Sequence, residues 1–91
     1  MSRARDPASH ARYAFFRNGR LAVVPAKRTH RVAVLTILSE RFERGRRYPE
    51  REVNALLADD GPDHATLRRL LVDEGLLRRD SGEYWRDQAG E

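Results

Sequence analysis

The chain is 91 residues long, carries a formal net charge of +4 and contains no cysteine. This length is that of one small domain with a single core, and the lack of cysteine excludes disulfides, thiol nucleophiles and cysteine-ligated metal sites. No apolar run is long enough to span a membrane, and the basic N-terminus lacks the apolar stretch of a signal peptide. We therefore expect a protein of the reducing cytoplasm.

Charge is divided unequally along the chain. Residues 1–20 contain five arginines and one aspartate, and residues 26–47 contain seven basic and two acidic side chains. Residues 48–77 reverse this balance, with three arginines and seven acids. Every basic residue except Lys27 is an arginine, which suits phosphate contacts, although a GC-rich genome produces the same bias. The pattern indicates a first half that faces nucleic acid or another acidic partner.

The N-terminal segment is predicted to be a flexible basic tail over residues 1–11, followed by a β-hairpin. Two β-prone runs, at 13–16 and 21–24, flank Asn18-Gly19. Asn-Gly between such runs is a strong signal of a hairpin, because both turn positions need positive φ. Pro25 ends the second predicted strand.

A first long helix is predicted over residues 27–43, where apolar side chains recur every three or four positions. Ile37 falls nearer the opposite side of this helix, and we expect either the hairpin or a partner to cover it. Gly45 stops the helix, and residues 46–48 follow as a very short strand. The expected buried stripe consists of Val32, Val34, Leu35, Leu38 and Phe42.

Two shorter helices are predicted next, at 49–58 and 64–74, separated by a turn at Gly61-Pro62. Pro49 suits a first helical position, Asp63 can cap the second of these helices, and Gly75 can end it. The expected buried residues are Val53, Leu56 and Leu57 in the first, and Leu67, Leu70 and Leu71 in the second.

The C-terminal part is predicted to be a second hairpin, starting at Leu76-Leu77, turning at residues 80–82 and returning through 83–86. Helix, short strand, helix, turn, helix and hairpin is the order of a winged helix-turn-helix. We therefore expect an α+β winged-helix domain over residues 12–87, with three helices, a C-terminal wing and a preceding N-terminal hairpin. Residues 88–91 are expected to be a flexible tail.

Several short sequence motifs between residues 19 and 86 also match the pattern of a known protein family. They are Gly19-Arg20-Leu21, Pro25-Ala26-Lys27-Arg28, Phe42, Gly45-Arg46, Tyr48, Glu52-Val53-Asn54, Leu67-Arg68-Arg69, Leu71-Val72-Asp73 and Tyr84-Trp85-Arg86. Residues 20–86 thereby resemble an uncharacterised prokaryotic domain family that occurs alone or fused to arsenic-repressor-type transcriptional regulators. Pro49 departs from this family, which often has a hydroxyl residue there. The resemblance implies a transcription-related role by association, and it carries over no site residue.

Candidate nucleic-acid contacts fall into three groups. On the third helix, the expected exposed side chains are His64, Thr66, Arg68 and Arg69. Five acids flank this helix and weaken its case as a phosphate-facing element, and Arg69 can instead pair with Asp73. The stronger electrostatic candidates lie around the first helix, and the wing adds backbone contacts. The first-helix group is Lys27, Arg28, Arg31, Arg44, Arg46 and Arg47, and the wing group is Arg78, Arg79 and Arg86.

For each of these candidate contacts a purely structural role is the alternative hypothesis. Arg44, Arg46 and Arg47 can complement the end of the first helix and the nearby Glu50 and Glu52. Of Tyr84 and Trp85, one is expected to face the core, and the other either packs over the first helix or contacts a base or a protein partner. Asn54 is expected to bond the backbone of the hairpin or the turn.

Catalysis, cofactor binding and metal binding are not expected. His10, His30 and His64 lack metal-ligand spacing, and the acidic turn at residues 59–63 lacks the closing glutamate of a calcium loop. The favoured function is that of a small bacterial transcriptional regulator that binds double-stranded DNA mainly through an arginine-rich surface. One alternative is a protein-interaction or dimerisation module of a transcription-factor system that does not bind DNA itself. A third hypothesis, less favoured than these two, is RNA binding through the same arginines.

Overall fold

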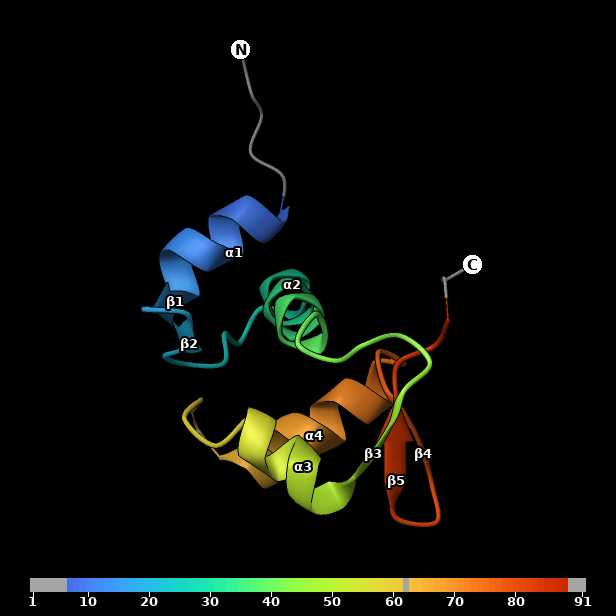
Figure 1. Ribbon diagram of the computed structural model, residues 1–91. Helices are drawn as coiled ribbons and strands as arrows, with labels where there is room; N and C mark the ends of the chain where they lie inside the picture. The colour runs from blue at the N-terminus through green and yellow to red at the C-terminus, as the bar shows by residue number, and fades with distance from the viewer. Residues whose placement is uncertain (1–6, 62, 89–91) are drawn as a thin grey trace.

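The computed structural model describes residues 7–61 and 63–88, and within them the chain has a small α+β fold with four helices and two antiparallel sheets (Figure 1). None of the described helices is long and apolar enough to cross a membrane. The helices are α1 (Pro7–Phe15), α2 (Arg28–Ser39), α3 (Glu50–Leu56) and α4 (His64–Asp73). The strands are β1 (Phe16–Arg17), β2 (Arg20–Leu21), β3 (Arg47–Pro49), β4 (Arg78–Asp80) and β5 (Glu83–Trp85).

The N-terminal segment differs from its prediction, because helix α1 replaces both the end of the predicted tail and the predicted strand at 13–16. Helical spacing places Ala11 and Phe15 toward α2, where Ala11 is buried, and leaves Tyr13 86% exposed. Packing against α2 therefore outweighs the β-propensity of the aromatic residues. The part of the predicted tail at residues 1–6 lies outside the described residues.

The predicted N-terminal hairpin is present but is only two residues deep on each side, with Phe16 paired to Leu21. Its turn is the one that the sequence indicates, since Asn18 and Gly19 both have positive φ, at 55° and 80°. The second strand ends at Leu21 rather than running to residue 24.

Helix α2 lies at the centre of the molecule, between α1 on one side and the α3–α4 pair on the other (Figure 1). This position buries more than one face of the helix, so that Val34, Leu35, Ile37 and Leu38 are all at most 7% exposed. Ile37 lies on the side of α2 that faces α1 and the start of the hairpin. Helix α1 and the N-terminal hairpin therefore cover Ile37, which is the first of the two alternatives that the sequence suggested.

Helices α3 and α4 close the other side of the core. Asp63 caps α4 as predicted, accepting a hydrogen bond from the Thr66 N–H at 2.8 Å. Leu67 and Leu71 are fully buried and Leu70 is half-buried. Leu56 is 36% exposed, so its placement in the buried stripe of α3 is wrong. Helix α3 ends at this residue, and only Val53 and Leu57 reach the core.

The second sheet has the strand order β3-β5-β4, with both neighbouring pairs antiparallel. The predicted C-terminal hairpin is thus confirmed, although β4 begins two residues after the predicted start. Its turn again uses two residues with positive φ, Ser81 at 52° and Gly82 at 82°. Tyr84 on the central strand is buried, and Trp85 is half-buried beneath the Arg47 guanidinium, 3.9 Å from the ring centre.

A buried ion pair joins the N-terminal hairpin to the rest of the fold. The Asp60 side chain is fully buried, accepts the Leu21 N–H at 2.6 Å and contacts both terminal nitrogens of Arg41 at 2.5 and 3.0 Å. Arg41 also donates to the carbonyls of Leu56 and Gly19, at 2.7 and 3.0 Å. Asp60 and Arg41 therefore hold together the β1–β2 turn, the end of α2 and the loop before α4.

Candidate nucleic-acid interface

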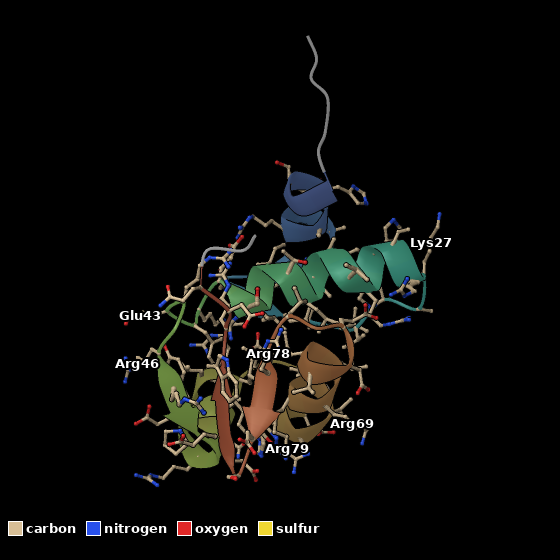
Figure 2. All side chains as sticks on the ribbon, turned by 90° about the vertical axis from the view of Figure 1, so that its right-hand side faces the viewer. Lys27, Glu43, Arg46, Arg69, Arg78 and Arg79 are labelled. Atoms are coloured by element: carbon tan, nitrogen blue, oxygen red, sulfur yellow. The ribbon has the colours of Figure 1, made fainter. Side chains whose placement is uncertain are left out.

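The basic residues predicted around the first helix lie at two separate ends of α2. The twelve residues of this helix span about 18 Å. Lys27 lies at one end and Arg46 lies beyond the other, as Figure 2 shows. The group therefore does not form one continuous surface.

Most members of this group are already engaged. Arg28 pairs with Glu74 at 2.8 Å, Arg46 with Glu52 at 3.5 Å and Arg47 with Glu83 at 3.6 Å. The pairing of Arg46 with Glu52 is the structural alternative that the sequence suggested. Arg31 and Arg44 donate to the backbone carbonyls of Ala26 and Asp87. Within residues 7–61 and 63–88, Lys27 is the one member of the group whose side chain contacts neither an acid nor a carbonyl.

The predicted readers on α4 divide into exposed and engaged side chains. His64 and Arg69 are exposed, whereas Thr66 is half-buried and its hydroxyl bonds the Asp63 carboxylate at 3.1 Å. The ion pair between Arg69 and Asp73 that the sequence spacing allows is not formed in the described part of the chain. Arg69 therefore remains available to an outside partner.

Arg68 is not the exposed reader that the sequence predicted. Its guanidinium turns toward α3, where it donates to the side-chain oxygen of Asn54 and lies 3.7 Å from Glu50. The side chain of Arg68 is only 18% exposed, and its guanidinium also lies 5.8 Å from the centre of the Tyr84 ring. Asn54 consequently bonds a side chain on α4 rather than the backbone, which corrects the prediction for both residues.

The structure brings α4 and the C-terminal hairpin together around a hollow of about 360 Å³. Arg68 and Arg69 come from α4 and Arg79 comes from β4, so three arginines line it against one acid, Asp73. Figure 2 shows Arg69 and Arg79 on the same face of the molecule. We call this feature the α4–β4 hollow, and it is lined by Ala65, Arg68, Arg69, Val72, Asp73, Arg79 and Tyr84.

Arg69 and Arg79 differ from the basic residues around α2 in their lack of acidic partners. In the described part of the chain neither forms an ion pair, and the Arg79 guanidinium lies 5.9 Å from the centre of the Tyr84 ring. The other predicted wing residues are engaged, because Arg78 pairs with Asp87 at 2.7 Å and Arg86 donates to the Phe42 carbonyl at 3.4 Å. Two unpaired guanidinium groups from different elements thus border one hollow.

Most of the acidic residues that precede and follow α4 form ion pairs or hydrogen bonds within the fold. Asp59 pairs with Arg20, Asp60 is buried against Arg41, and Glu74 pairs with Arg28. Asp63 caps α4, and the Thr66 N–H that it accepts holds the pKa of this carboxyl below its ordinary value. Three of the acids that flank α4 are therefore balanced by neighbouring arginines, and the fourth, Asp63, accepts hydrogen bonds at the start of the helix.

Sequence reasoning missed the hollow itself, because its walls come from α4 and from a strand that follows five residues later. One available signal was the spacing of Ala65, Arg69 and Asp73 at intervals of four, which places them on one stripe of a helix. Among the described residues, no group of three or more histidine, aspartate or glutamate side chains is arranged to hold a metal ion.

Comparison with known proteins identifies a protein family. The model of a family described as "uncharacterized protein conserved in bacteria (DUF2087)" matches residues 20–86, a span that runs from β2 through β5 and includes the α4–β4 hollow. Neither a curated protein nor a solved structure matches the chain. Since the matched region covers well over half of its length, the chain belongs to this family of uncharacterised bacterial proteins.

Proposed function

We propose that the chain is a winged-helix protein that binds double-stranded DNA through α4 and β4, and that it acts as a small bacterial transcriptional regulator. The observation that carries this proposal is that Arg69 and Arg79, on the two sides of the α4–β4 hollow, have no acidic partner among the described residues. Arginine binds phosphate through a planar fork of donors and keeps its charge at any physiological pH.

The arrangement of elements supports the winged-helix assignment. Helices α2, α3 and α4 follow one another, β3 lies between the first two, and the β4–β5 hairpin follows the third. In such a fold α4 takes the place of the recognition helix and the hairpin that of the wing. Helix α4 is ten residues long, and an α-helix with its side chains is about 10–12 Å across, which fits the major groove, about 12 Å wide.

The charge balance supports phosphate contact at this face rather than around α2. A phosphate group in the hollow would meet Arg69 from α4 and Arg79 from β4, neither of which would have to leave another anion. At the ends of α2, by contrast, Arg28, Arg46 and Arg47 each lie beside a glutamate whose negative charge would repel a phosphate group. We therefore propose the arginine-rich DNA contact on the C-terminal half of the domain.

The test is fluorescence anisotropy with a labelled mixed-sequence duplex, titrated at several salt concentrations. Wild-type protein is expected to bind with an affinity that falls as salt rises. The double variant Arg69→Gln/Arg79→Gln should lower the slope of log K against log salt by about 1.8, because each lost phosphate contact removes about 0.9. Arg17→Gln is the control, since Arg17 is an exposed arginine away from the hollow whose guanidinium bonds the Phe16 carbonyl and, among the described residues, no acid.

A second candidate function, a protein-interaction module that does not bind DNA, is favoured by one other feature. Leu56 is exposed and lines a hollow of about 340 Å³ together with Tyr48, Arg46 and Glu52. Exposed apolar surface rimmed by charges is typical of protein contact sites. Absence of salt-dependent DNA binding by the wild-type protein, or an unchanged slope in the double variant, would reject the DNA proposal and favour this one.

A further inference from the structure

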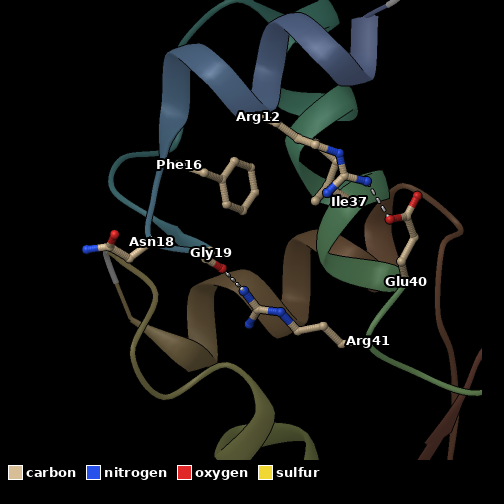
Figure 3. Close-up of a pocket in the computed structure, with 7 residues that line it drawn as sticks. All are labelled: Arg12, Phe16, Asn18, Gly19, Ile37, Glu40 and Arg41. Atoms are coloured by element: carbon tan, nitrogen blue, oxygen red, sulfur yellow. Dashed lines mark hydrogen bonds and ion pairs between the residues drawn. The ribbon is translucent and has the colours of Figure 1, made fainter.

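A separate hollow of about 440 Å³ lies between α1, the β1–β2 turn and the end of α2, remote from β4 and β5 (Figure 3). We infer that this α1–α2 hollow binds an α-amino acid with an apolar side chain, in its zwitterionic form. The inference concerns a small-molecule site and does not depend on DNA binding. The residues that carry it are Phe16, Ile37, Arg12, Glu40 and Arg41.

The floor of the hollow is apolar. The Phe16 ring is half-buried and extends toward Ile37, which is 7% exposed (Figure 3). An apolar side chain of a ligand that packs on these two residues would lose its contact with water, and this burial is the general source of affinity for small ligands. The volume of the hollow lies in the range of roughly 300–1,000 Å³ that is usual for ligand sites.

The rim of the hollow carries one charge of each sign. Arg12 from α1 and Glu40 from the end of α2 form an ion pair at 2.8 Å, and their side chains are 54% and 46% exposed. Such an exposed pair contributes little to stability, so it can open at little cost. An amino acid would restore both interactions, with its carboxylate on Arg12 and its ammonium on Glu40.

The same rim selects against ligands with a single charge. A carboxylate or phosphate that takes Arg12 would leave Glu40 beside an added negative charge, and an amine that takes Glu40 would leave Arg12 unpaired. Arg41, the other arginine of the wall, cannot compensate because both of its terminal nitrogens already bind Asp60 and backbone carbonyls. The hollow therefore favours a zwitterion over either singly charged analogue.

The wall beneath the rim is held in place before any ligand enters. Arg41 fixes the β1–β2 turn through the Gly19 carbonyl, drawn as a dashed line in Figure 3, and it is itself fixed by the buried Asp60. A preformed wall reduces the ordering that a ligand must impose, which improves affinity.

The experiment is a titration of the isotope-labelled full chain with L-phenylalanine, without DNA, followed by amide chemical shifts. We expect saturable shifts at Phe16, Gly19, Ile37 and Glu40. N-acetyl-L-phenylalanine lacks the ammonium and L-phenylalaninamide lacks the carboxylate. Each is expected to bind up to about fivefold more weakly, which is the change in affinity that one exposed ion pair produces at the upper end of its usual strength.

A variant at the rim separates charge recognition from simple apolar binding. Glu40→Gln should weaken L-phenylalanine binding and remove its advantage over N-acetyl-L-phenylalanine. Glu43→Gln is the matched control, because Glu43 is an exposed glutamate three residues further on that does not line this hollow. Amide shifts outside the hollow report whether either variant disturbs the fold.

The inference would be overturned by an absence of shifts at these residues with both L-phenylalanine and L-leucine at about 10 mM, which corresponds to an interaction too weak for a specific site. Equal affinities for the zwitterion and both analogues, or an unchanged preference in Glu40→Gln, would also overturn it. Because no DNA is present, these outcomes are independent of whether the α4–β4 hollow binds DNA.

Discussion

Replacing Asp60 with alanine is expected to destabilise the protein by about 3–5 kcal/mol, the usual loss when one partner of a buried ion pair is removed. Three hydrogen bonds to the Asp60 carboxylate disappear, one from the Leu21 N–H and two from Arg41. The Leu21 N–H is left buried without its acceptor, which alone costs about 1–3 kcal/mol. Arg41 keeps two carbonyl contacts and is 24% exposed, so its charge is only partly stranded.

The effect is large relative to the stability of a domain of this size. Small domains unfold with free energies of roughly 5–15 kcal/mol, so Asp60→Ala would remove a substantial fraction. With about 4–8 °C of melting temperature per kcal/mol, the midpoint should fall by at least about 12 °C. Urea denaturation followed by the fluorescence of Trp85, the single tryptophan, measures the change directly.

The neighbouring acid provides the control. Asp59 pairs with Arg20 on the surface, where the two side chains are 68% and 53% exposed, so Asp59→Ala should cost less than about 1 kcal/mol. A double-mutant cycle of Asp60→Ala with Arg41→Met should show strong coupling between the two sites. A loss of less than about 1 kcal/mol in Asp60→Ala, or a loss equal to that of Asp59→Ala, would refute the reasoning that this carboxylate is a buried anchor.

Three further predictions concern helix α4 and the second hairpin. The Thr66 N–H lowers the pKa of Asp63 below its ordinary value, so the stability that Asp63 contributes is present above its unfolded pKa and is lost as pH falls through the folded pKa. Asp63→Asn keeps a capping acceptor, but in urea melts its free energy of unfolding should depend less on pH in the acid range. An unchanged pH dependence would show that other carboxyl groups cause it. Leu71→Ala should lower the free energy of unfolding by about 2–5 kcal/mol, and Leu70→Ala should lower it by less because Leu70 is only half-buried. Equal losses would mean that the inner face of α4 is misassigned. Gly82→Ala should cost about 1–2 kcal/mol at a φ of 82°, and a neutral effect in thermal melts would contradict a rigid turn.

Several features of the fold could be predicted because their causes are local. Asn18-Gly19 takes two positive φ values, as the dipeptide indicates, and Gly75 takes one at the end of α4. The Asp63 cap acts over three residues, and the leucine spacing of α4 places Leu67 and Leu71 in the core. Each of these outcomes depends on neighbours within one or two turns of chain.

The N-terminal helix could not be predicted in the same way. The run from Tyr13 to Phe16 has the composition of a strand, and its conformation depends on contact with α2, which begins twelve residues later. A short segment with weak local preference takes the structure that buries its apolar side chains, and here that choice is made by a distant helix.

The charged residues show most clearly which features follow from the sequence and which depend on the tertiary structure. The sequence by itself determined how many arginines and acids surround α4, and it indicated that the chain is a small α+β domain with hairpins at both ends. Only the tertiary structure decided that Arg68 turns inward to Asn54 and that Asp60 is buried against Arg41. It also decided that Arg69 and Arg79 lie across one hollow without an acidic partner in the part of the chain that is described. The physical reason is that ion pairs and hydrogen bonds act over a few ångströms, so the role of a charge depends on the elements that the fold brings beside it.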